Sequence, residues 1–264
     1  VIATGVCHTD LHIVEGELPP RRAPVVPGHQ VVGVVERAGP GVEVRPGDRV
    51  GVTWLYRACG QCPACLRAAQ NLCPEARFTG YDVDGGYADF MIADAQHVYP
   101  IPEQFTDIEA APLLCAGIIG YRSLRLAEVE RGERVGLFGF GASAHLAIQV
   151  AVFWKCEVFV FTRSAEHRRL AEELGAVWTG AVEDRPPAPL DRAILFAPSG
   201  ALIPQALGAL RPGGTLAVNA VYLDRIPAMD YGLLYGERTL RSVTNLTPRD
   251  AREFLGLAAE IPVR

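Results

Sequence analysis

The chain has 264 residues, of which 49% are hydrophobic and 21% are charged, and its formal net charge is −5. This composition is typical of a globular protein of one large or two ordinary domains, and it excludes a disordered acidic or basic tail. No apolar run reaches the roughly 18 residues of a membrane-spanning helix, and the acidic balance gives no basic surface, so we expect neither a membrane nor a nucleic-acid partner.

The first hundred residues carry the pattern of short β-strands. Apolar runs rich in β-branched residues predict strands at 31–35 and 49–52, separated by Gly and Pro turns, and a further run predicts a strand at 86–92. Residues 54–80 show no clear period. We therefore expect a β-rich domain that includes an irregular, cysteine-rich lobe.

From residue 106 the hydrophobic pattern becomes helical and then alternates with short apolar strands. Helices are expected at 107–114, 120–126, 142–153, 166–174 and 203–210, and strands at 134–138, 157–161, 192–196 and 216–219. Such alternation predicts a doubly wound parallel sheet. The chain is thus expected to be an α/β protein, with a β-rich domain at 1–105 and a dinucleotide-binding domain at 106–264.

Four of the seven cysteines lie within fifteen residues, in the order Cys59, Cys62, Cys65 and Cys73. An odd total in a chain that starts without a signal peptide argues against a disulfide framework and favours a reducing cytoplasm. Four thiolates at this spacing can close a tetrahedron around a structural zinc ion. Four buried free thiols or an iron–sulfur cluster are the weaker alternatives.

A glycine-rich turn follows the predicted strand at 134–138 and opens the next helix. It reads Gly-Phe-Gly-Ala-Ser-Ala and matches a dinucleotide fingerprint through Gly139, Gly141, Ala142 and Ala144. The glycines permit a tight turn, and the helix N-terminus offers amide groups to a pyrophosphate. A plain glycine-rich strand–helix turn is the alternative.

The acidic residue that often binds the ribose of NAD is missing after the second strand of this domain. The segment carries hydroxyl and guanidinium groups instead, at Thr162, Arg163, Ser164 and Arg168. These groups suit a 2′-phosphate, so the sequence favours NADP(H) over NAD(H). A solvated basic start to a helix is the alternative.

Three dispersed residues, Cys7, His29 and Cys115, could converge as metal ligands. Two cysteines and one histidine would leave a fourth position open for water or substrate, as a catalytic zinc requires. Taken singly, each residue is more often a buried thiol or a core histidine.

Together these motifs resemble the zinc-dependent medium-chain alcohol dehydrogenases, and most closely the bacterial branch similar to cinnamyl alcohol dehydrogenases. The resemblance extends over essentially the whole chain. It is carried by the segments at 5–10, 27–29 and 47–50, by the four-cysteine lobe at about 54–80 and by the Gly139 turn. It implies a GroES-like catalytic domain followed by a Rossmann domain, an active site between them, and hydride transfer between NAD(P)(H) and a primary alcohol or aldehyde.

The resemblance also implies roles for individual residues. Cys7, His29 and Cys115 match the catalytic zinc ligands, and the four-cysteine lobe matches a structural zinc site, which gives two zinc ions per chain. Thr9 matches the hydroxyl that takes the alcohol proton and His12 the relay to solvent, while Asp10 matches the carboxylate that orients the ligand histidine. His8 falls where the family contacts the cofactor pyrophosphate; for His8 and His12 a surface histidine is the alternative.

Two departures from the family pattern stand out. Gln30 occupies the position after the ligand histidine, where the family usually has glutamate, so the site loses one negative charge. Relatives usually extend further at both ends, so we expect a GroES-like domain that is incomplete there. Trp54 is a candidate for the substrate pocket, with core packing as the alternative.

Family habit implies a homodimer or homotetramer in the cytoplasm. A zinc-stapled nucleotide-binding protein without turnover, or a zinc-independent quinone or enoyl reductase of the same superfamily, remain the alternative functions.

Overall fold

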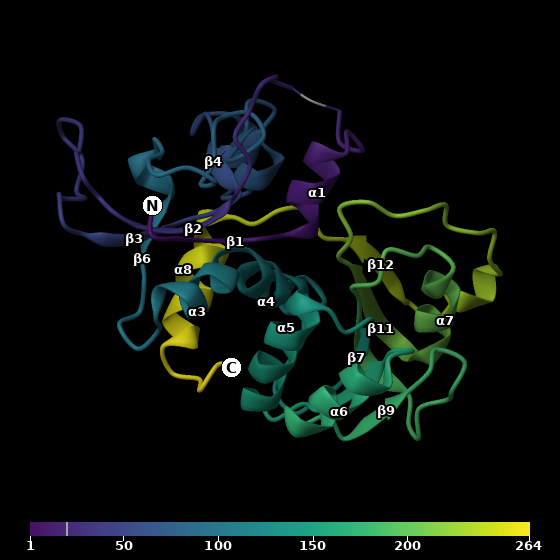
Figure 1. Ribbon diagram of the computed structural model, residues 1–264. Coiled ribbons are helices and arrows are strands. Elements are labelled where there is room, and N and C mark those ends of the chain that lie inside the picture. Colours follow the sequence, from purple (N-terminus) through teal and green to yellow (C-terminus); the bar gives the residue numbers. More distant parts are fainter. Residues whose placement is uncertain (20) are drawn as a thin grey trace. The chain divides into compact units, whose positions relative to one another are not determined.

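The computed structural model of the protein describes residues 1–19 and 21–264, which form two compact units. The first unit contains residues 1–118 and 245–262, and the second contains residues 119–244 and 263–264. Figure 1 labels their elements. No helix among the described residues is long and apolar enough to cross a membrane.

The first unit is built on a four-stranded sheet in the order β1-β2-β3-β6, in which every neighbouring pair is antiparallel. Its strands are β1 (Ala3–Gly5), β2 (Gln30–Val34), β3 (Arg49–Val52) and β6 (Val98–Pro100). Its longer helices are α1 (His8–Val14), α3 (Asp107–Pro112) and α8 (Pro248–Ala258). Val32, Leu114 and Phe254 are almost completely buried, so apolar residues of the sheet, the turn after α3 and α8 belong to the core of this unit.

The cysteine-rich lobe of this unit has little regular structure. It contains the two-stranded pair β4 (Leu55–Arg57) and β5 (Arg77–Phe78), the single turn α2 (Pro63–Leu66) and a 3₁₀ turn at Gln70–Leu72. Leu66 and Leu72 are 76% and 52% exposed, so the apolar side chains of these turns contribute little to a core.

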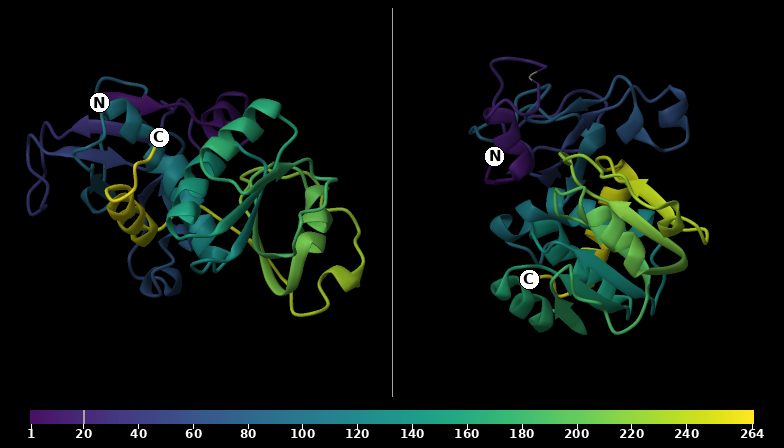
Figure 2. Two further views of the ribbon diagram at one scale, coloured as in Figure 1. Left: turned by 90° about the horizontal axis from the view of Figure 1, so that it is seen from below. Right: turned by 90° about the vertical axis from the view of Figure 1, so that its right-hand side faces the viewer.

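The second unit contains a six-stranded parallel sheet in the order β12-β11-β10-β7-β8-β9. Its strands are β7 (Arg134–Phe138), β8 (Glu157–Phe161), β9 (Trp178–Gly180), β10 (Leu190–Leu195), β11 (Leu210–Val218) and β12 (Thr239–Ser242). Its helices are α4 (Ile118–Leu126), α5 (Ala142–Phe153), α6 (Ala165–Glu173) and α7 (Leu202–Ala209). Figures 1 and 2 show α5 and α6 on one face of the sheet and α7 on the other, so the sheet is doubly wound.

The fold class predicted from the sequence is confirmed, and most predicted elements lie within a residue or two of those observed. The strand expected at 86–92 is wrong. The backbone amides of Gly86 and Tyr87 donate to the carbonyls of Gly28 and Pro27, while the Asp89 carbonyl accepts from the chain's first amino group. The segment therefore bonds as irregular backbone to the loop at residues 26–29, which carries His29 and is called the ligand loop below, rather than pairing as a strand.

The division into compact units differs from the domain boundary at residue 106 that the change of hydrophobic period suggested. The helix α3 packs against β1 and β2, and α8 packs against the turn that follows α3, so both helices belong to the first unit. A carbonyl of α8, that of Ala258, also accepts a hydrogen bond from Gln104. The chain thus returns to its first unit after completing the parallel sheet.

Candidate metal and dinucleotide sites

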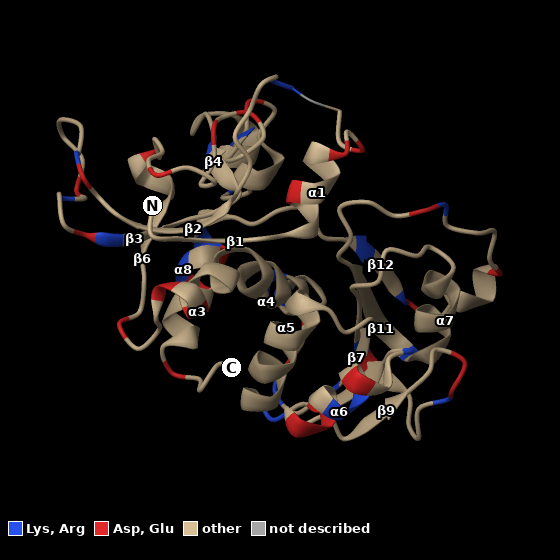
Figure 3. Ribbon diagram, in the orientation of Figure 1, with Lys and Arg blue, Asp and Glu red and all other residues tan. Residues whose placement is uncertain are grey.

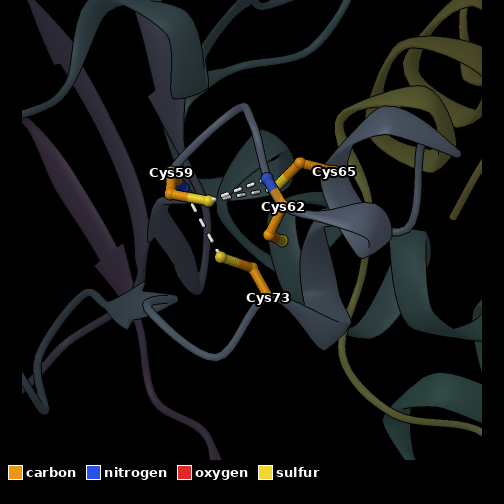
Figure 4. A group of neighbouring side chains, drawn as sticks. All are labelled: Cys59, Cys62, Cys65 and Cys73. Carbon is orange, nitrogen blue, oxygen red and sulfur yellow. Dashed lines mark hydrogen bonds between the residues drawn. The ribbon is translucent and has the colours of Figure 1, made fainter.

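The four cysteines of the lobe lie together, as their spacing predicts. The sulfurs of Cys59, Cys62, Cys65 and Cys73 all lie within 4.8 Å of one another, and Figure 4 shows the four side chains gathered around one point of the lobe. The Cys62 amide donates to the Cys59 sulfur at 3.4 Å, and the Cys59 amide donates to the Cys73 sulfur at 3.4 Å. Backbone donors aimed at sulfur favour thiolates, which is the form that binds zinc.

The thiols of this cluster influence one another strongly. Backbone hydrogen bonding lowers the pKa of Cys62 to about 7, whereas burial raises the pKa of Cys65 to about 12. Without a cation, four thiolates so close together would repel, and a divalent ion offsets that repulsion. The donor set and its compactness fit a closed, structural zinc site.

The second group comprises Cys7, His29 and Cys115, whose ligand atoms also lie within 4.8 Å of one another. Cys7 precedes α1, His29 precedes β2, and Cys115 lies on a π-helical turn at Leu113–Gly117. Leu113 and Leu114 are buried and hold this turn in the core of the first unit. Three elements of one unit thus converge on a small space with two sulfurs and one imidazole.

Asp10 lies in α1, where Figure 3 colours acidic positions red, and its carboxylate orients the imidazole of this group. Asp10 Oδ1 lies 3.0 Å from His29 Nδ1 and accepts from the Gly28 amide at 3.1 Å, and its Oδ2 accepts from the Cys7 amide at 2.9 Å. An Nδ1–H bonded to a carboxylate leaves Nε2 as the acceptor nitrogen, the one available to a metal. Asp10 therefore contacts the backbone or side chain of two candidate ligands.

The charges of this buried group also fit a cation. Hydrogen bonding from Cys115 and His29 lowers the pKa of Cys7 far below its usual range despite burial, while the same pairing raises the pKa of Cys115. Burial disfavours the His29 cation, but hydrogen bonds to Asp10 and Cys7 outweigh it and raise the pKa of His29 to about 9. The buried Asp10 carboxylate and the lowered pKa of Cys7 both favour positive charge at this point, and this fits a divalent metal ion.

The sequence also singled out three residues of α1 around this group. Thr9 is buried, and its hydroxyl accepts from the Cys7 thiol at 3.7 Å. His12 contacts Glu17 through Nδ1 and has a side chain that is 22% exposed. His8 is exposed, and its ring centroid lies 6.2 Å from that of His12. Thr9 thus adjoins a candidate ligand directly, while both histidines have access to solvent.

Gln30 and Trp54 flank the same group on β2 and beside β4. The Gln30 amide packs along Gly5, where a Cβ on Gly5 would lie 2.7 Å from Gln30 Oε1. The rings of Trp54 and His29 pack edge to face with their centroids 4.9 Å apart, and Trp54 stacks on Phe78 with a centroid distance of 5.2 Å. Trp54 is half-buried, and its ring lies directly beside that of His29.

The glycine-rich turn lies at the carboxyl end of β7, between β8 and β10, where the strand order of the sheet reverses. Gly139 has φ +92°, and a Cβ there would approach the Ala197 amide to 2.8 Å, so only glycine fits. A Cβ at Gly141 would meet no atom within 4 Å, so that side of the turn is open. Gly141 caps α5, whose first residues include Ala142 and Ala144, and the turn therefore fits a dinucleotide pyrophosphate.

The segment expected to contact the ribose follows β8, the neighbouring strand. Arg163 is exposed, whereas the Arg168 guanidinium donates to the Thr162 carbonyl at 2.8 Å and Ser164 caps α6. The Gly139 amide donates to Phe161, the last residue of β8, at 2.9 Å. The turn and the segment at 162–168 therefore lie at the same edge of the sheet.

One contact in the metal group was not foreseen from the sequence. Tyr87 Oη donates to Asp10 Oδ2 at 3.1 Å, although 77 residues separate the two in the chain. The Gly85-Gly86 doublet before it was the available signal, because adjacent glycines mark a place where backbones approach closely. The apolar pattern after Gly86 predicts a strand instead, which the structure does not contain.

Comparison with known proteins identifies the family of the chain. Residues 1–103 match the model of the alcohol dehydrogenase GroES-like domain. A probable alcohol dehydrogenase of Mycobacterium tuberculosis is 51% identical to the chain over 98% of its length and 77% of the relative.

Three solved structures of similar proteins align with 97% of this chain, and the aligned part makes up 78% of each of those chains. They include a cinnamyl alcohol dehydrogenase of Sorghum bicolor (30% identity, TM-score 0.89) and the CAD of Helicobacter pylori in complex with NADP(H) (26%, 0.87). A third is a thermostable alcohol dehydrogenase of Pyrobaculum aerophilum with cobalt and zinc bound (26%, 0.88). With its GroES-like and Rossmann folds, its two cysteine-containing groups and a relative sharing half its residues, the chain belongs to the zinc-containing medium-chain alcohol dehydrogenases, a family of oxidoreductases.

Proposed function

We propose that this alcohol dehydrogenase depends on zinc, binds two zinc ions per chain and prefers NADP(H), with primary alcohols or aldehydes as substrates. The observation that carries the proposal is the convergence of half-buried Cys7 and Cys115 with buried His29, their ligand atoms within 4.8 Å of one another. Three protein ligands leave a fourth position for substrate. The zinc in the Pyrobaculum relative supports the choice of metal.

Cys7, His29 and Cys115 would hold the catalytic zinc, and the four-cysteine lobe would hold the structural one. When bound, zinc acts as a Lewis acid on the substrate oxygen and the nicotinamide exchanges the hydride. Asp10 keeps the His29 imidazole in the orientation that presents Nε2. Gln30 replaces a carboxylate beside this group with a neutral amide of the same shape.

Thr9 and His12 would move the substrate proton. The Thr9 hydroxyl can both accept and donate, and its contact with the Cys7 thiol keeps it next to the ligands. The His12 imidazole is partly exposed and has two ring nitrogens that can accept and donate a proton, so it can pass a proton to water. His8 is assigned to the cofactor only through the family resemblance.

The dinucleotide would bind at the Gly139 turn, with Thr162, Arg163, Ser164 and Arg168 near the adenosine ribose. Arg163 is exposed at the edge of the sheet that carries the turn, where a 2′-phosphate needs a cation. The bound NADP(H) of the Helicobacter relative supports the same preference. We further propose a homodimer or homotetramer in a reducing cytoplasm, where free thiols persist.

The first test is zinc content together with turnover. We expect two zinc ions per chain by elemental analysis, and oxidation of NADPH in the presence of aldehydes. A content of one zinc per chain, in protein whose four-cysteine lobe is intact, would contradict the assignment of Cys7, His29 and Cys115 as ligands of a catalytic zinc. NADPH binding without turnover would instead identify a nucleotide-binding protein.

Arg163 tests the cofactor preference. Replacing it (Arg163→Ala) removes a charge-assisted hydrogen bond to the 2′-phosphate, worth about 1.5–3 kcal/mol, so kcat/KM for NADPH should fall about 10- to 160-fold. The value for NADH should change less than about 3-fold, because NADH has no such phosphate. Arg169, an exposed arginine of α6, gives the matched control Arg169→Ala, for which we expect neither value to change. Equal losses with both cofactors would contradict the assignment.

A further inference from the structure

The carboxylate of Asp10 accepts four hydrogen bonds, and one of them comes from the exposed residue Tyr87. Three come from the Cys7 and Gly28 amides and from His29 Nδ1, at 2.9, 3.1 and 3.0 Å. The fourth comes from Tyr87 Oη, at 3.1 Å from Oδ2. A carboxylate offers about four acceptor positions, so the four donors use its whole capacity.

The hydroxyl of Tyr87 has one proton and two acceptors nearby. The second acceptor is the Gly5 carbonyl, at 3.4 Å. The carboxylate is closer and charged, and charge-assisted hydrogen bonds are the stronger ones. The proton therefore lies on the Asp10 side.

The backbone around Tyr87 is held against the loop that carries His29. The amides of Gly85, Gly86 and Tyr87 donate to carbonyls of residues 26–28 at 2.7 to 3.1 Å. A Cβ on Gly28 would lie 2.9 Å from the Tyr87 amide, and a Cβ on Gly85 would lie 2.1 Å from the Gly28 carbonyl. These approaches permit no side chain, so the position of Tyr87 is fixed relative to the ligand loop.

Asp10 is 2% exposed, whereas Tyr87 is 40% exposed. A buried carboxylate that loses a donor cannot recruit bulk water freely, and its second oxygen would keep only the Cys7 amide. The carboxylate could then rotate away from the geometry that holds His29. The Tyr87 hydroxyl thus supplies the last donor of the Asp10 hydrogen-bond network, on the side that is exposed to solvent.

We propose that Tyr87 is a positioning residue for the catalytic metal: through Asp10 it fixes the imidazole of His29 and so slows release of the ion. The proposal rests on the proposed function, because it assumes that Cys7, His29 and Cys115 bind the metal. Tyr87 acts through two intervening groups and touches no ligand side chain in this role. Its effect should accordingly be smaller than that of changing Asp10 itself.

The test compares zinc release from the full chain with that from Tyr87→Phe, which keeps the ring and removes only the hydroxyl. Zinc per chain is measured first; then release into a colorimetric chelator is followed with time. We expect one of the two ions to leave about 3- to 30-fold faster in the variant, below the upper range for groups that contact a ligand directly. The ion of the four-cysteine lobe should leave at an unchanged rate and serves as an internal reference.

Two further variants distinguish positioning of Asp10 by the Tyr87 hydroxyl from a general loosening of the segment at 85–87. Thr4→Val removes the hydrogen bond from Thr4 Oγ1 to the Gly86 carbonyl, which anchors the same segment without touching Asp10. We expect its release rates to match the unmodified chain, and in an Asp10→Asn background Tyr87→Phe should have no added effect. In the cobalt-substituted protein, Tyr87→Phe should shift the visible bands of one site only.

The outcomes are distinguishable. One zinc per unmodified chain would overturn the proposed function whatever Tyr87 does. Two zinc ions with equal release from Tyr87→Phe would overturn the positioning role alone. Equal acceleration in Thr4→Val and Tyr87→Phe would also overturn it, because the effect would then come from the segment and not from the hydroxyl.

Discussion

Replacing Cys115 by alanine is expected to reduce the zinc content from two ions to one per chain and to lower kcat/KM for aldehyde reduction by about 10³-fold or more. Its sulfur is one of three ligand atoms in the Cys7 group, and two remaining ligands hold zinc poorly. Lewis-acid assistance is worth several kcal/mol, and about 4 kcal/mol corresponds to a factor near 10³. Elemental analysis and steady-state kinetics with NADPH measure both quantities.

Cys156 provides the matched control. It is a buried thiol outside both metal groups, and its sulfur donates to the Glu130 carbonyl at 3.3 Å. Cys156→Ala should keep two zinc ions and nearly unchanged kinetics. If Cys115→Ala retained both ions, or activity within about 10-fold of the unmodified chain, Cys115 would not be a ligand of the catalytic metal.

The second large effect is expected in stability, from Cys65→Ala in the lobe. Structural zinc contributes directly to folding, with apparent binding free energies of about 10–16 kcal/mol in small zinc domains. Losing even about 4 kcal/mol would lower Tm by roughly 8–16 °C in a unit of this size. Scanning calorimetry in reducing buffer measures the shift, and limited proteolysis should locate new cleavage at residues 59–73.

A change in the same lobe that leaves the sulfurs intact is the control for this prediction. Leu66 is 76% exposed, so Leu66→Ala removes little buried surface and should change the free energy of unfolding by no more than about 0.5 kcal/mol. A Tm for Cys65→Ala equal to that of Leu66→Ala would show that the lobe does not depend on a metal.

The two candidate metal groups differ in how well they can be predicted from the sequence. The four cysteines of the lobe are close along the chain, so spacing alone predicts that their sulfurs meet. Cys7, His29 and Cys115 are far apart in the chain, so residue type alone indicated that they could converge, and the family resemblance assigned them to one site. The structure places their ligand atoms within 4.8 Å of one another. The contact of Tyr87 with Asp10 was not predicted, because the Gly85-Gly86 doublet indicates a close backbone approach but does not identify the segment approached.

The same distinction holds for the fold. The strands β7 and β8 and the helix α5 were predicted to the residue, because a buried parallel sheet imposes an apolar pattern that can be recognised locally. The segment at 86–92 has a strand-like composition, but its hydrogen bonds are determined by the distant ligand loop. The return of α8 to the first unit depends likewise on tertiary packing rather than on local propensity.

The spacing of the ligands has a consequence for how the protein assembles. Closing the lobe joins residues within a fifteen-residue stretch, whereas the Cys7 group joins residues more than a hundred positions apart. The difference in loop-closure entropy is about 2 kcal/mol in favour of the lobe. During synthesis, the lobe has all its ligands once Cys73 has emerged, while the other group must wait for Cys115. If both groups bind zinc as proposed, a growing chain has the complete ligand set of the structural ion before it has that of the catalytic ion.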